Sequence, residues 1–97
     1  MPMAFELTFK NGTTEQYDKV LKMMGLKSGG KGPATAYFHW AAKTKDGMRV
    51  VDVWESQAEF DKFAKEQIGP YSAKAGLAPP SVTAYEVYSY IVGGRAK

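Results

Sequence analysis

The stretch Arg49-Val50-Val51-Asp52-Val53-Trp54-Glu55-Ser56, followed by Phe60 and Phe63, decides the fold of this chain. An apolar run with the composition of a strand ends at Ser56, a good helix-capping residue, and Glu59 completes a capping box. Phe60 and Phe63 then recur at helical spacing. The pattern therefore predicts a strand that leads directly into an amphipathic helix.

The same order of elements occurs nearer the start of the chain. Residues 3 to 9 alternate between apolar and polar side chains, which predicts a strand. Thr13 and Gln16 have the spacing of a capping box, and the helix that they open ends at Gly25. Its apolar stripe consists of Tyr17, Val20, Leu21 and Met24.

Further segments complete the predicted order. Residues 35 to 42 and 48 to 55 form two strands of a hairpin, because Asp46-Gly47 between them is a turn signal. Gly69-Pro70 is expected to break the second helix, and residues 82 to 92 to form the last strand. Residues 25 to 33 are rich in glycine and are predicted to be a flexible connector. The order βαββαβ indicates an α+β, ferredoxin-like fold, with a four-stranded antiparallel sheet and both helices on one face.

The two faces of this sheet predict an assembly. Pairing Ala42 with Met48 across the hairpin places two sets of side chains on opposite faces: Phe38, Trp40, Val50, Asp52 and Trp54 on one, and Tyr37, His39, Val51 and Val53 on the other. Both sets are largely apolar or aromatic, whereas an antiparallel sheet with one wet face alternates with polar residues. The sequence therefore predicts a homodimer in which a second copy covers the face without helices.

Composition narrows the function classes. The 97 residues predict a single domain, residues 1–97, with 93–97 as a flexible tail. Lys and Arg exceed Asp and Glu by only 13 to 10 and are spread along the chain, so no nucleic-acid partner is expected. No apolar run approaches the ~20 residues of a membrane span, and no signal peptide is indicated. Without cysteine and with one histidine, neither a metal nor a cofactor is predicted, and a cytoplasmic location is expected.

The stretch from Arg49 to Ser56 with Phe60 and Phe63 resembles the dimeric α+β barrel superfamily, which includes antibiotic-biosynthesis-type and haem-degrading monooxygenases. The resemblance runs from about Met3 to Ile91. It implies two ferredoxin-like protomers packed sheet to sheet into a barrel, each with a pocket between its own sheet and helices. Trp54 matches the strand tryptophan of the haem-degrading members. The iron-binding histidine that follows their second helix has no counterpart here, so the resemblance does not extend to haem.

Two polar residues are candidate catalytic groups, and each has a structural alternative. Asp52 lies mid-strand among valines, where a buried carboxylate either transfers protons or pairs with Arg49, a lysine or a tyrosine. His39 is either a general base or a hydrogen-bonded residue near the interface. The candidate ligand-binding walls, which plain core packing would also explain, are Tyr17, Phe38, Trp40, Trp54, Phe63 and Tyr88.

Two functions stay open from the sequence. In the first, a homodimer binds a small apolar or aromatic molecule between sheet and helices and acts as a cofactor-independent monooxygenase, with Asp52 as base or proton shuttle. In the second, the chain is a non-enzymatic binding or interaction protein and the same residues are only core. The sequence does not decide whether the protein is an enzyme. A cavity beside Trp54 favours the first function, and close packing there favours the second.

Overall fold

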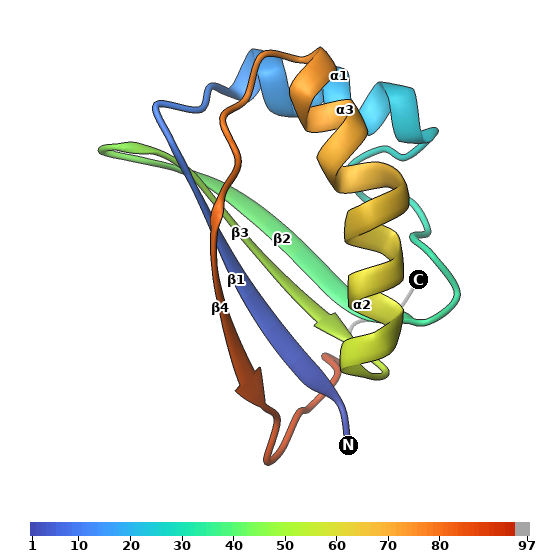
Figure 1. The fold of residues 1–97 in the computed structure, drawn as a ribbon. Coiled ribbons are helices and arrows are strands. Elements are labelled where there is room, and N and C mark those ends of the chain that lie inside the picture. Colours follow the sequence, from blue (N-terminus) through green and yellow to red (C-terminus); the bar gives the residue numbers. More distant parts are fainter. Residues whose placement is uncertain (95–97) are drawn as a thin grey trace.

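The computed structural model of the protein describes residues 1–94, so the part of the predicted tail after residue 94 lies outside the described residues. Eight elements follow one another along the chain (Figure 1): β1 (Met3–Lys10), α1 (Thr14–Met24), β2 (Ala36–Thr44), β3 (Gly47–Trp54), α2 (Gln57–Phe63), a π-helical turn η1 (Ala64–Ile68), α3 (Gly69–Lys74) and β4 (Ser81–Glu86).

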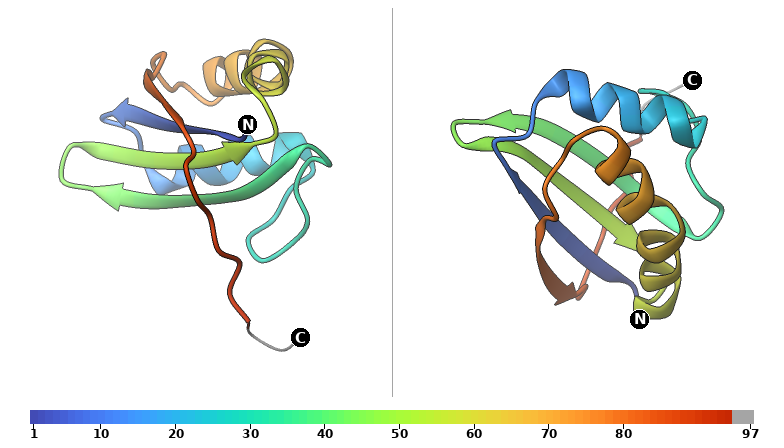
Figure 2. Two further views of the ribbon diagram at one scale, coloured as in Figure 1. Left: turned by 90° about the horizontal axis from the view of Figure 1, so that it is seen from below. Right: turned by 45° about the horizontal axis from the view of Figure 1, so that its top comes forward.

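The four strands form one antiparallel sheet in the order β2-β3-β1-β4. The helices lie together on one side of this sheet, and the other side carries no helix (Figures 1 and 2). The predicted α+β, ferredoxin-like fold is therefore confirmed. β2 and β4 are the outer strands of the sheet, and β2 is paired only with β3. None of the helices within residues 1–94 is long and apolar enough to cross a membrane.

The helix starts follow the capping signals of the sequence. Thr13 accepts a hydrogen bond from the Gln16 amide, and the Gln16 side chain accepts one from the Thr13 amide, so the first predicted capping box is present. Ser56 accepts a hydrogen bond from the Glu59 amide at the start of α2. At the other end of α1, Gly25 adopts the left-handed conformation with φ 75°, which ends the helix.

The predicted break at Gly69-Pro70 is wrong, because the helical path continues from Gln57 to Lys74. The π-helical turn η1 explains the difference. Its wider hydrogen-bond pattern, in which the Gly69 amide donates to the carbonyl oxygen of Ala64, changes the register just before the proline. Pro70 follows this turn directly, as the second residue of α3.

The predicted hairpin register is wrong by one residue. The strands extend to Thr44 and Gly47 around a two-residue turn, and Ala42 pairs with Arg49 instead of Met48. A one-residue slip moves every side chain of one strand to the opposite face. His39 therefore pairs with Asp52 on the side of the helices. The aromatic residues on either side of it, Phe38 and Trp40, pair with Val53 and Val51 on the side without helices.

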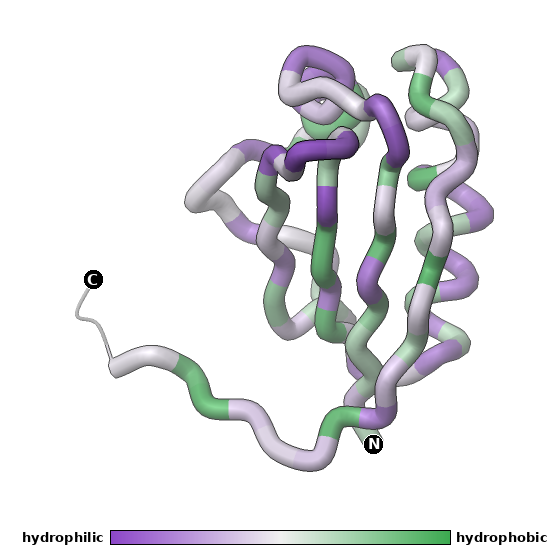
Figure 3. The backbone as a smooth tube through the Cα atoms, turned by 90° about the vertical axis from the view of Figure 1, so that its left-hand side faces the viewer, coloured by the Kyte–Doolittle hydropathy of each residue, from purple (hydrophilic) through white to green (hydrophobic). Residues whose placement is uncertain are grey.

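The last strand is shorter than predicted, since β4 ends at Glu86 and the expected strand continued to residue 92. The Val87 amide still donates a hydrogen bond to the carbonyl oxygen of Pro2, at 3.0 Å. Beyond it the chain leaves the sheet and runs away from the body of the protein (Figure 3). Tyr90 is the one aromatic residue of this segment that contacts an aromatic ring of β2, that of Tyr37, with ring centroids 5.3 Å apart.

The core lies between the sheet and the long helical stretch formed by α2, η1 and α3. Its buried members are Phe5, Leu7, Phe9, Met48, Val50, Trp54 and Phe60. Phe5 from β1 stacks on Phe60 from α2 with ring centroids 3.8 Å apart, and Trp54 packs against Phe63 at 4.9 Å. The period-two pattern of β1 and the apolar stripe of the second helix thus meet as the sequence predicts. This contact places Trp54 next to the candidate site.

Candidate functional site

Asp52 is a buried carboxylate with a partner for each of its oxygens. Only 5 % of the residue is exposed, and it lies in the middle of β3 on the side of the helices. Oδ1 accepts a hydrogen bond from Nδ1 of His39 at 2.5 Å, and Oδ2 accepts one from Nε1 of Trp54 at 3.2 Å. Trp54 reaches the same carboxylate because residues two apart on a strand share a face. A buried charge is tolerated when it is hydrogen-bonded in this way.

His39 connects this carboxylate to a tyrosine. The hairpin register places His39 directly opposite Asp52, and its Nε2 lies 2.6 Å from the hydroxyl of Tyr17. An ionised carboxylate can only accept hydrogen bonds, so Nδ1 is the donor to Asp52, and in a neutral imidazole it carries the single ring proton. Nε2 is then the acceptor, and the Tyr17 hydroxyl donates to it. The ring of His39 thus has a defined tautomer, with its basic nitrogen directed at Tyr17.

Tyr17 comes from α1, where the capping box at Thr13 fixes the start of the helix and the apolar stripe faces the sheet. Burial raises the pKa of the Tyr17 hydroxyl above its usual value, and the negative charges of Asp52 and Asp18 raise it further. The hydroxyl therefore keeps its proton at neutral pH and serves as a hydrogen-bond donor. Its ring is almost parallel to the imidazole of His39, with centroids 6.0 Å apart.

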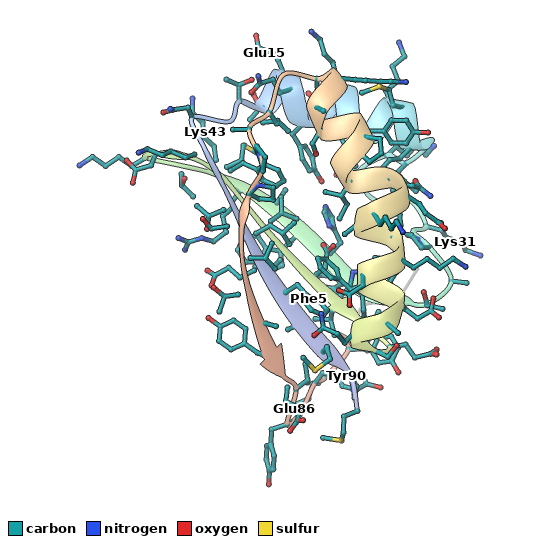
Figure 4. All side chains as sticks on the ribbon, viewed as in Figure 1. Phe5, Glu15, Lys31, Lys43, Glu86 and Tyr90 are labelled. Carbon is teal, nitrogen blue, oxygen red and sulfur yellow. The ribbon has the colours of Figure 1, made fainter. Side chains whose placement is uncertain are left out.

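These residues stand on the wall of a cavity of about 670 Å³ between the sheet and the helices. The floor is formed by side chains of β1, β2 and β3, one side by α1 and the other by the helical stretch from α2 to α3. Figure 4 shows side chains of the helical layer and of the sheet projecting into the space between them. A volume of this size is within the range of pockets that hold small organic molecules. Trp54 borders this cavity and is at the same time packed against Phe63 in the core.

Most of the side chains proposed from the sequence gather at this cavity. Five of them line it on the side of the helices: Tyr17, His39, Asp52, Trp54 and Phe63. Phe38 and Trp40 also border it from the outer strand β2, but they belong to the face without helices, where they are 65 % and 43 % exposed. Their placement on the Trp54 face is thus corrected, and the register shift is the reason.

Tyr88 lies apart from the other candidates. It follows the end of β4, it is 98 % exposed, and it does not line the cavity. The sequence placed it in the last strand, where alternation would have carried it to the sheet surface. Because β4 stops two residues earlier, this placement is not realised.

Two parts of the cavity wall were not singled out as site residues from the sequence. Residues 26 to 33, interpreted as a connector, form one wall. Ser72 of α3 is a buried polar residue that also lines the cavity. The expected helix break at Gly69-Pro70 hid the signal for Ser72, because the inward stripe predicted for the second helix ended at Ile68. Within residues 1–94, no three side chains of the His, Asp and Glu types are grouped to hold a metal ion.

Two solved structures have a similar fold. One is that of a proposed antibiotic biosynthesis monooxygenase from Deinococcus radiodurans, with a TM-score of 0.56 and 11 % identity over 95 % of this chain and 97 % of that chain. The other is that of a proposed antibiotic biosynthesis monooxygenase from Chloroflexus aurantiacus, with a TM-score of 0.57 and 14 % identity over 99 % of this chain and 98 % of that chain. Neither a family model nor a curated protein matches the sequence. The likeness agrees with the fold that the sequence resemblance implied, and at these identities it concerns the fold alone.

Proposed function

We propose that this protein binds a small aromatic or apolar molecule with an acidic proton in the cavity, and that Tyr17 and His39 withdraw that proton. One observation carries the proposal: the hydrogen-bonded chain from Tyr17 through His39 to Asp52 ends at the wall of a cavity of about 670 Å³. General base catalysis needs a base whose tautomer is fixed and whose proton has a defined path. The hydrogen-bonded series from Tyr17 through His39 to Asp52 meets both needs.

The proton path follows from the donors and acceptors. An acidic hydroxyl of the ligand donates to the oxygen of Tyr17, and as its proton transfers, the Tyr17 proton passes to Nε2 of His39 over the 2.6 Å that separates the two atoms. The imidazolium that forms is stabilised by the carboxylate of Asp52, whose second oxygen is held by Trp54. In this scheme His39 is the base and Asp52 orients it, in the way that a carboxylate orients histidine in hydrolase triads.

The reaction that we propose for the deprotonated ligand is cofactor-independent monooxygenation. An electron-rich carbanion or phenolate reacts with dioxygen once it is held away from water. A ring CH₂ becomes C=O, one oxygen atom enters the product and the other leaves as water. The four electrons come from the substrate carbon, so no external reductant is needed. The names given to the two similar structures support this reaction class.

We also propose that the protein is a homodimer joined through the face of the sheet that carries no helix. Exposed aromatic residues on this face support the assembly, among them Phe38, Trp40 and Tyr85, next to half-buried Val51 and Val53. A 97-residue chain that leaves such side chains in water gains stability when a second copy covers them.

A non-enzymatic role is the second candidate, and one observation favours it. The Tyr17 hydroxyl already donates to Nε2 of His39, and within residues 1–94 no buried side-chain nitrogen or oxygen lacks a hydrogen-bond partner. A series of hydrogen-bonded side chains such as this one also stabilises a fold, since it fixes the position of α1 against β2 and β3. In that case the cavity binds a molecule without altering it.

Thermal shift and oxygen uptake together distinguish the two candidates. The parent, His39→Gln and Lys62→Gln are incubated with phenols, quinols and anthrones; Lys62 is exposed on α2 and lines no cavity, so it serves as the control. We expect ligands to raise Tm in all three proteins, and oxygen uptake to fall by about 10²–10⁴-fold only in His39→Gln. A raised Tm without oxygen uptake indicates non-enzymatic binding. The absence of any Tm shift refutes the binding pocket.

A further inference from the structure

A second hollow adjoins the cavity and has a different character. It is a groove of about 480 Å³ between α1 and the outer strand β2. Seven residues border both spaces, so the groove continues from the cavity: Tyr17, Leu21, Leu26, Lys27, Ser28, Ala41 and Met48. A molecule seated beside Tyr17 can therefore extend along the groove without crossing a wall.

On β2 the groove is bordered by Ala41, Ala42 and Lys43. Ala41 and Lys43 pair with Val50 and Met48 and share the face of β2 that also carries His39, which borders the cavity. The small side chain of Ala41 leaves room between the imidazole and the lysine. Lys43 follows His39 by four positions on an extended strand, which places their Cα atoms about 13 Å apart. A ligand that reaches both is thus elongated.

The groove is basic. It is bordered by Lys22, Lys27 and Lys43 and by a single acidic residue, Asp18. The two ion pairs found within residues 1–94, His39 with Asp52 and Arg49 with Glu6, involve none of these lysines. All three are exposed, so an anion reaches them at little cost in desolvation. Lys43 lies at the hairpin side of the molecule, and Lys31, which borders only the cavity, lies on the opposite side (Figure 4).

We propose that this groove binds an anionic group of the ligand, so that the substrate is an elongated molecule with an acidic ring at one end and a carboxylate, sulfate or phosphate at the other. The ring hydroxyl faces Tyr17 and His39, and the anion lies among Lys22, Lys27 and Lys43. The inference rests on the proposed function, because it names the class of molecule that the same site takes.

The test compares two probes of equal length, para-hydroxyphenylpentanoate and the neutral para-hydroxyphenylpentanol. Dissociation constants are measured by calorimetry in about 0.05 M and about 0.5 M salt, between which the screening length falls severalfold. We expect the acid to bind about five- to tenfold more tightly than the alcohol at low salt, and the advantage to shrink at high salt. The alcohol should bind equally at both salt concentrations.

Matched variants locate the anion. Lys22→Gln and Lys43→Gln, at two residues that border the groove but not the cavity, are each expected to weaken binding of the acid about two- to fivefold and to leave binding of the alcohol unchanged, as expected for exposed charge pairs. Asp18→Asn should strengthen binding of the acid about twofold, and Lys62→Gln should have no effect. Equal binding of acid and alcohol at both salt concentrations overturns the anion site and leaves the binding pocket intact. If neither probe binds, both proposals fail.

Discussion

Replacing Asp52 by asparagine is expected to reverse the direction of two hydrogen bonds, the one between residue 52 and His39 and the one between His39 and Tyr17. Asparagine offers one acceptor oxygen and one NH₂ donor in place of two acceptor oxygens. The indole N–H of Trp54 can only donate, so the amide oxygen must face Trp54 and the NH₂ must face Nδ1 of His39. Nδ1 then has to accept, the imidazole proton moves to Nε2, and the Tyr17 hydroxyl must turn to accept from it.

The energetic cost follows from the same bonds. Two hydrogen bonds to a charged group, worth about 1.5–3 kcal/mol each, become neutral bonds worth about 0.5–1.5 kcal/mol each. His39 is partly exposed, so its hydrogen bond to residue 52 contributes less to this difference. The substitution also removes the buried negative charge, which offsets part of the cost. We expect a loss of about 2 kcal/mol in the free energy of unfolding, which corresponds to a Tm lower by about 8–16 °C for a chain of this size. The fold should survive.

Nitrogen-15 NMR of histidine-labelled protein measures the tautomer directly, and His39 is the only histidine of the chain, so the spectrum has no overlap. The parent should show protonated Nδ1 and the Asp52→Asn variant protonated Nε2. Asp18→Asn is the control, because Asp18 lies next to Tyr17 in α1 and makes no side-chain bond to His39. The same tautomer in the parent and in Asp52→Asn, or a changed tautomer in the control, would refute the hydrogen-bond directions assigned to Tyr17, His39 and Asp52.

Three further outcomes are expected. Trp54→Ala should cost about 3–5 kcal/mol in urea unfolding, because a large buried ring is removed and Oδ2 of Asp52 loses its donor; a loss below 1 kcal/mol would contradict the packing described. Light scattering after gel filtration should give about twice 10.7 kDa for the parent and a monomer for Trp40→Asp, with Lys62→Asp still dimeric; a monomeric parent would count against the assembly. The free energy of unfolding should fall as pH rises above 10.0, because the pKa of Tyr17 is higher in the folded than in the unfolded protein and the unfolded chain therefore loses its proton first. Tyr17→Phe should flatten this decline, and an equally steep decline in that variant would contradict the assignment of the pH dependence to Tyr17.

The signals that predicted the fold are local in the chain. Thr13 and Ser56 begin the two helices as expected, and Gly25 ends the first, because each acts through its own backbone neighbourhood. The apolar stripes then allow only one way to cover the sheet. Pro70 misled the prediction, since the π-helical turn that accommodates it depends on hydrogen bonds that no residue type announces.

The composition of the site was predicted better than its geometry, and Gly47 shows why. The sequence interpretation placed Gly47 in a connection between the two strands, residues 43 to 47, but Gly47 is a strand residue paired with both Thr44 and Lys10. With φ 149°, it stands where a Cβ would collide with the carbonyl oxygen of Phe9. The contact with β1 thus selects glycine here, and it sets the register of the hairpin. Such a contact between distant segments is invisible in a local pattern, and it decides that His39 meets Asp52.

His39 lies on an outer strand of the sheet, so its hydrogen bond to Asp52 depends on how stably that strand stays paired. β2 has a neighbour on one side only, so it is held by fewer backbone hydrogen bonds than β1 or β3 and opens more often than they do. Each opening separates His39 from Asp52 and admits water to the carboxylate. Closure of this edge therefore also brings His39 and Asp52 together. A ligand or a second copy of the chain that contacts β2 keeps this strand paired. It therefore lengthens the time for which His39 stays hydrogen-bonded to Asp52.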